Sequence, residues 1–173
     1  FVRSGSSWSQ QAYLKASNAE AYDYFGASVA VAGDTVVAGA PLEDGNGTGG
    51  QSDNSAAFAG AAYVFVRSGS SWSQQAYLKA SNVEAADYFG LSVGVAGDTV
   101  VAGADQEDGN GTDGESDNSA FNAGAAYVYG APAEVYVSTV AAGVTGDALA
   151  YGPHDILQWD GSGWSKWFDG SAA

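Results

Sequence analysis

Apolar and polar residues alternate along several short stretches of the chain that are separated by glycine-containing turns. Ser28–Val31 and Thr35–Ala38 alternate with a period of two residues, are rich in valine and flank the turn Ala32-Gly33-Asp34. This pattern is typical of an antiparallel hairpin, because successive side chains of a strand point to opposite faces. A second hairpin is predicted from Ala61–Val66 and Trp72–Ala80, joined by residues 67–71.

The chain contains a long internal repeat. Phe1–Asn18 recurs without change as Phe65–Asn82, an offset of 64 residues, and Tyr24–Ala40 recurs almost unchanged as Tyr88–Ala104. Glycine recurs every few residues and no apolar stripe of helical period persists, so helices are not expected. Four strands per repeat predict an all-β fold of four-stranded antiparallel units, which is the pattern of β-propeller blades.

The repeats do not make up whole blades. We expect repeats at 1–64 and 65–128 within a region 1–129, followed at 130–173 by a divergent blade or the start of a second β module. The first residues supply only the last strands of one blade, the next blade is complete, and the copy that starts at Phe89 lacks the Trp-containing final strand after Tyr129. The prediction is therefore an incomplete propeller or blade array. Either the chain is a piece of a longer array, as its first residue Phe1 favours, or neighbouring subunits complete one another's sheets.

Two short motifs carry a resemblance to a known family. Phe25-Gly26 is followed by Gly39-Ala40-Pro41, and the motif returns as Phe89-Gly90 and Gly103-Ala104. Over roughly Phe1–Tyr129 the chain resembles the FG-GAP repeat, the blade of integrin α-subunit propellers and of many microbial surface proteins. The resemblance implies an extracellular or cell-surface location and a structural role in cell adhesion, or in surface or filament assembly.

The resemblance also gives a set of packing residues. The glycines of the motifs would allow close packing and tight turns. Apolar side chains of the first repeat would then fill the gaps between blades. The residues expected there are Phe25, Val29, Val31, Val36 and Tyr63.

Oxygen-bearing side chains fall at alternate positions of the long loop in each repeat. Side chains at i, i+2 and i+4 can turn toward one hard cation, and the resemblance implies Ca²⁺ in this loop, whereas soft transition metals are disfavoured. Asn46 and Thr48 stand where the family pattern has carboxylates, and the following glycine is displaced to Gly50. A solvated acidic loop is the alternative. The candidate metal ligands are Asp44, Asn46, Thr48, Asp53, Asp108, Asn110, Thr112 and Asp117.

The charge balance narrows the range of partners. Twenty acidic against 5 basic residues give a net charge of −15, which disfavours nucleic acid as a partner. No apolar run of about 18 residues predicts a membrane span. The chain has no cysteine and no methionine, which suits an exposed protein. Asn46 and Asn110 each begin an Asn-Gly-Thr sequon and are candidate glycosylation sites.

Two other functions stay open beside adhesion and self-association through strand or blade sharing. Trp159, Trp164 and Trp167 are candidate ligand-binding residues, because tryptophan stacks on sugar rings, and they favour a lectin-like carbohydrate-binding module as the alternative. The partners would be protein or glycan ligands. An enzyme is the third possibility, but His154 is the single histidine and no nucleophile elbow accompanies it, so we predict no catalysis.

Overall fold

Both predicted hairpins of the repeat form, and each closes through a two-residue turn. Ala32 pairs with Thr35 around Gly33-Asp34, and Gly33 has φ 55°, a left-handed conformation that favours glycine. Ser68 pairs with Ser71, so the second turn is shorter than the predicted loop at 67–71. An ion pair between Arg67 and Asp34 links the two turns.

The computed structural model describes residues 1–112, 114–130, 156–159 and 164–168, and every regular element in them is a strand. No helix in these residues is long and apolar enough to cross a membrane. The strands are β1 (Val2–Ser4), β2 (Ser7–Ser9), β3 (Ser28–Ala32), β4 (Thr35–Ala40), β5 (Ala61–Ser68), β6 (Ser71–Leu78), β7 (Ser92–Ala96), β8 (Thr99–Ala104), β9 (Ala125–Gly130), β10 (Ile156–Trp159) and β11 (Trp164–Phe168).

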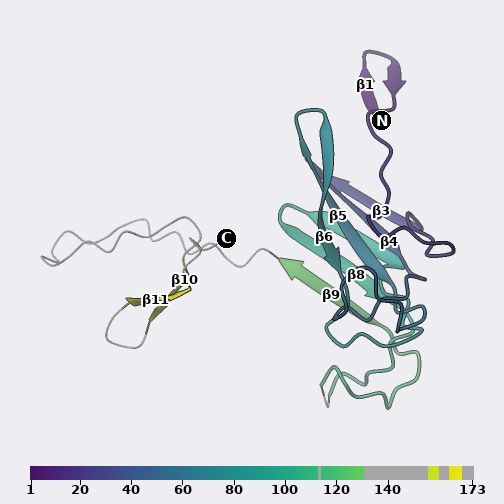
Figure 1. The fold of residues 1–173 in the computed structure, drawn as a ribbon, viewed down its shortest axis with the longest axis vertical. Helices are drawn as coiled ribbons and strands as arrows, with labels where there is room; N and C mark the ends of the chain where they lie inside the picture. The colour runs from purple at the N-terminus through teal and green to yellow at the C-terminus, as the bar shows by residue number, and fades with distance from the viewer. Residues whose placement is uncertain (113, 131–155, 160–163, 169–173) are drawn as a thin grey trace, which may run out of the picture. The chain divides into compact units, whose positions relative to one another are not determined.

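The strands form antiparallel sheets of unequal size (Figure 1). The order β3-β4-β5-β6 makes a complete four-stranded blade, called here the first blade, and β7-β8-β9 are the strands of the second blade among the described residues. The hairpin β1-β2 corresponds in sequence to the end of β5 and the start of β6. The prediction of an all-β fold with incomplete propeller blades is confirmed.

The chain divides into two compact units, Phe1–Glu134 and Val135–Ala173. The first unit contains the N-terminal hairpin and both blades. In the second unit β10 pairs with β11 in antiparallel fashion, with Trp159 opposite Trp164 and an irregularity between Ile156 and Leu157.

Phe89 is the centre of the core between the two blades. Its ring is fully buried among apolar residues of the first blade and contacts the rings of Tyr127 and Tyr129 in the second, with centroids 5.4 and 6.1 Å apart. Phe25 holds the same place in the first blade, where its ring lies 5.4 Å from Tyr63 and 6.0 Å from Phe65. The Phe of each FG motif therefore packs onto the blade that it begins.

The glycines of the motifs let the backbones of the two blades touch. Gly60 forms a parallel bridge with Phe89, and Gly90, at φ 85°, continues the contact. A Cβ atom on Gly39 would clash with the carbonyl oxygen of Gly90, which also accepts a 2.7 Å hydrogen bond from the Ser28 hydroxyl. The FG motif of the second blade therefore contacts the GAP motif of the first blade through the backbone.

The predicted packing residues divide into two groups. Tyr63 is fully buried, and Phe25 and Val36 pack partly buried against the same cluster. For Val29 and Val31 the prediction is wrong, because they are 69 % and 70 % exposed. Their strand, β3, is an edge of the first blade, and in the described residues no blade precedes it.

Candidate functional site

A buried carboxylate opens the long polar loop of each repeat. These loops, residues 43–59 and 107–123, are called here the first and second acidic loops. Glu43 is 1 % exposed. It accepts a 3.0 Å hydrogen bond from the backbone N–H of Gly45 and a 3.1 Å bond from Asn18 Nδ2. The glutamate therefore joins its own loop to the segment that precedes the first blade.

Two donors from the end of the first blade complete the shell around Glu43. The hydroxyl of Tyr77 donates to Oε1 at 2.8 Å, and the ammonium of Lys79 donates to Oε2 at 2.9 Å. Burial raises the pKa of the Tyr77 hydroxyl, and its bond to Glu43 adds to the shift. Burial also lowers the pKa of Lys79, while the Glu43 carboxylate opposes the change. The ion pair thus holds the acidic loop against β6.

The second acidic loop opens on the equivalent carboxylate, and two of the four contacts found at Glu43 recur there among the described residues. Glu107 is 5 % exposed and accepts bonds from Gly109 N–H at 2.9 Å and from Asn82 Nδ2 at 3.0 Å. In the sequence, Ala141 and Gly143 correspond to Tyr77 and Lys79 at the offset of 64 residues. Alanine carries no donor and glycine has no side chain, so these two positions supply no side-chain donor to Glu107.

The candidate ligands of the first acidic loop lie in that loop and bind its backbone. Asp44 Oδ1 accepts from Phe58 N–H at 2.7 Å. Asn46 Oδ1 accepts from the N–H and hydroxyl of Thr48, both at 2.8 Å, and from Gly49 N–H at 3.1 Å. Asp53 Oδ2 accepts from Asn46 N–H at 2.8 Å, a bond that lowers the Asp53 pKa. These oxygens close the loop upon itself.

The second acidic loop repeats these contacts. Asp108 accepts from Asn122 N–H at 2.6 Å, and Asn110 Oδ1 accepts from the N–H and hydroxyl of Thr112 at 2.7 and 2.6 Å. Asp117 Oδ2 accepts from the Ser119 hydroxyl at 2.8 Å, which lowers the Asp117 pKa.

This donor set fits a calcium ion poorly. In the described part of the chain no three His, Cys, Asp or Glu side chains gather as a metal group. Three donors already surround the Asn46 oxygen, whereas Ca²⁺ needs six to eight oxygens directed at one point. Calcium binding stays a prediction from the sequence.

The structure describes the two candidate glycosylation sites but not the three candidate ligand-binding side chains. The Nδ2 of Asn46 donates to Ser55 Oγ at 2.7 Å, and that of Asn110 donates to Ser119 Oγ at 2.8 Å. Glycosylation of these asparagines stays a prediction. Trp159, Trp164 and Trp167 belong to β10 and β11, but their side chains lie outside the described residues.

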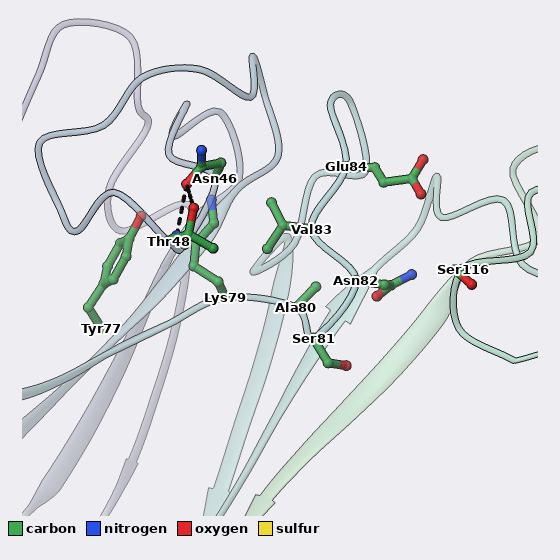
Figure 2. A pocket seen from close by; sticks show the side chains of 11 residues that line it. Asn46, Thr48, Tyr77, Lys79, Ala80, Ser81, Asn82, Val83, Glu84 and Ser116 are labelled. Carbon is green, nitrogen blue, oxygen red and sulfur yellow. Dashed lines mark hydrogen bonds between the residues drawn. The ribbon is translucent and has the colours of Figure 1, made fainter.

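A groove of about 580 Å³ lies where the first acidic loop meets the segment that follows β6 (Figure 2). Asn46 and Thr48 line it from the loop, and Lys79, Asn82 and Glu84 line it from the segment. The sequence pattern did not predict this groove, because it indicated no role for Lys79. Lys15, Asn18 and Glu43 recur at an offset of 64 residues as Lys79, Asn82 and Glu107, and this recurrence is the signal that could have found it.

A further buried carboxylate lies near the second acidic loop. Asp87 is 6 % exposed, and in the described residues its Oδ2 has no hydrogen-bond partner. Burial raises the Asp87 pKa to about 6, and the negative charges of Glu84 and Glu107 add to the shift. Asp23, the matching residue of the first repeat, accepts a 3.0 Å bond from Glu20 N–H.

A comparison with known protein families finds the same two repeats. Residues 8–65 and 72–129 each match the model of a family described as FG-GAP repeat. A search of curated proteins gave no match. The two matched segments begin near the two copies of the Trp-containing strand and end at β5 and β9.

Proposed function

Because the chain belongs to the FG-GAP repeat family, we propose that it is a non-enzymatic extracellular repeat protein that works in adhesion or surface assembly by stacking blades across subunits. FG-GAP repeats are blades of propellers, and blades are stabilised by contact with their neighbours. The observation that carries the proposal is a difference between two equivalent strands. β5 pairs with both β4 and β6, whereas β9 pairs only with β8 among the described residues.

Burial of equivalent residues supports the same proposal. Val64 of β5 is 7 % exposed, whereas Val128, its counterpart in β9, is 69 % exposed. An open strand edge with apolar side chains is a place where another strand adds to a sheet. A structural role also agrees with the use of the buried polar groups, since Glu43 and Lys79 neutralise each other.

Sedimentation velocity of the 173-residue chain tests this proposal. We expect species larger than the 17.4 kDa monomer that increase with protein concentration. A chain that stays monomeric at about 100 μM would contradict assembly through blade edges.

Calcium binding by the acidic loops is a separate proposal. The net charge of −15 supports it, because an acidic surface attracts cations. A thermal melt in millimolar calcium and in excess chelator tests it. Binding to the folded chain would raise the melting temperature with calcium concentration, and coincident melts would contradict it.

A further inference from the structure

The contact between the first and second blades is a template for a further contact. Phe89-Gly90 packs against Ser28, Gly39 and Gly60 of the first blade, which are called here the docking residues. Gly60 forms a bridge with Phe89, and the Ser28 hydroxyl donates to the Gly90 carbonyl. The junction therefore combines a Phe-Gly dipeptide from one blade with a serine and two glycines from the other.

The second blade has equivalent docking residues. Ser92, Gly103 and Gly124 are the residues that correspond to those of the first blade, and they line a hollow of about 410 Å³. At the repeat offset the chain has Pro153-His154 in place of a third Phe-Gly pair. Its own repeat thus supplies no matching dipeptide for this hollow.

The start of the chain carries counterparts of Tyr77 and Lys79, the two side chains that donate to Glu43 from the end of the first blade. Phe1–Asn18 has the same sequence as Phe65–Asn82, the segment that contains β6 and Lys79. Tyr13, the counterpart of Tyr77, is 80 % exposed, and Lys15, the counterpart of Lys79, is exposed as well.

We propose that a second copy of this chain docks head to tail. Its residues Ser9–Leu14 become the fourth strand of the second blade, with Tyr13 and Lys15 donating to Glu107. This inference rests on the proposed function and names its partner and contacts. Phe25-Gly26 of the incoming copy enters the hollow at Gly103.

The register follows from the pairing of β5 with β6. Tyr63 pairs with Tyr77 and Val64 with Ala76. The same pairing between copies places Tyr13 opposite Tyr127 and Ala12 opposite Val128. Because the two surfaces differ, the contact is heterologous and repeats from copy to copy, which gives a filament or a closed ring.

Charge sets the conditions of assembly. Each copy carries −15, so the copies repel at low ionic strength, and salt screens this repulsion. The Lys15 to Glu107 pair is buried on docking and is screened less. We expect stronger association at about 0.15 M salt than at about 0.01 M.

Cysteine cross-linking in the full chain tests the register, since the natural chain has no cysteine. Ala12→Cys combined with Val128→Cys should give a ladder of reducible dimers and larger species under mild oxidation. Ala12→Cys with Ser70→Cys is the control, because Ser70 is an exposed residue of the β5–β6 turn.

Substitutions at the ion pair give a second readout. Lys15→Ala or Glu107→Gln should raise the dissociation constant about tenfold or more, as expected for a buried charged hydrogen bond. Lys15→Arg, which keeps the charge, should lose less.

The outcomes separate this inference from the proposed function. Large species without a specific link between positions 12 and 128, or without an effect of Lys15→Ala, would overturn the register and leave assembly standing. A chain that stays monomeric would overturn both.

Discussion

The ammonium group of Lys79 lies 2.9 Å from the carboxylate of Glu43, and both side chains are almost fully withdrawn from water. The two residues lie at the same end of the first blade but come from different segments, one from the loop after β4 and one from the segment after β6. Removing one partner of a buried ion pair leaves the other charge uncompensated, which costs more than the pair itself contributes.

Lys79→Ala should therefore destabilise the chain by about 3 kcal/mol or more. Urea unfolding at a concentration where the chain is monomeric measures the effect. Lys15→Ala is the matched control, because it has the same sequence neighbours but is exposed, and it should change the unfolding free energy by about 0.5 kcal/mol or less. Equal effects of the two variants would contradict the role of the buried pair.

Gly39→Ala should open the junction between the blades. The added Cβ would meet the Gly90 carbonyl oxygen, a backbone atom held by the bridge at Gly60, so relief requires the blades to separate. We expect a loss of about 2 kcal/mol or more, and faster hydrogen exchange in β7.

Gly103→Ala provides the control for this variant. A Cβ there meets mainly the Ser92 hydroxyl, which can rotate away, and the next atom is 3.8 Å distant. The variant should stay close to the parent in stability as a monomer. If Gly103→Ala were as damaging as Gly39→Ala, the loss would reflect strand propensity rather than contact between blades.

Asp87 should make stability depend on pH. Its folded pKa of about 6 lies above the ordinary aspartate pKa of 3.8. The folded chain then binds the proton more tightly than the unfolded chain, so stability is highest below about pH 4 and falls as pH rises to about 6. Asp87→Asn should stabilise the chain by about 1–2 kcal/mol at pH 7 and by little at pH 4.

Urea unfolding at both pH values measures this difference, with Asp23→Asn as control. Asp23 also has a raised pKa, caused mainly by burial, and a backbone hydrogen bond opposes the shift as it does for Asp87, but the increase is larger for Asp87. The gain for Asp23→Asn should be smaller. A gain for Asp87→Asn that does not change with pH would contradict this explanation.

The sequence predicted the parts of the fold that depend on local pattern. The alternation in Ser28–Val31 and the turn at Ala32-Gly33-Asp34 predict a hairpin without reference to distant residues, and the hairpin forms with Ala32 paired to Thr35. The exposure of Val29 and Val31 was not predictable in this way, because burial of a blade edge depends on whether another blade covers it.

The buried polar groups were harder to predict than the hairpins. Glu43 stands in an acidic run that indicates a solvated or metal-binding loop, and its burial depends on Asn18 and Lys79, which lie 25 and 36 residues away. Asn46 has the spacing of a metal ligand, but its oxygen binds the N–H groups that follow it. A local pattern cannot distinguish an oxygen that binds the backbone from one that binds a cation.

Phe89 and Phe25 should differ in their contribution to stability although they occupy the same position of the repeat. Phe89 is fully buried between two blades, so Phe89→Ala leaves a cavity and should cost about 3–5 kcal/mol. Phe25 is covered by the first blade alone and is only partly buried. Phe25→Ala should cost about half as much in the monomer.

The two phenylalanines become equivalent when a copy docks at Gly103. Phe25→Ala should then weaken association by about tenfold or more, whereas Phe89→Ala should act on folding of each chain. Urea unfolding and sedimentation of the same samples separate the two effects. A Phe25→Ala variant that assembles as well as the parent would show that the Phe-Gly dipeptide stabilises its own blade and takes no part in contact between copies.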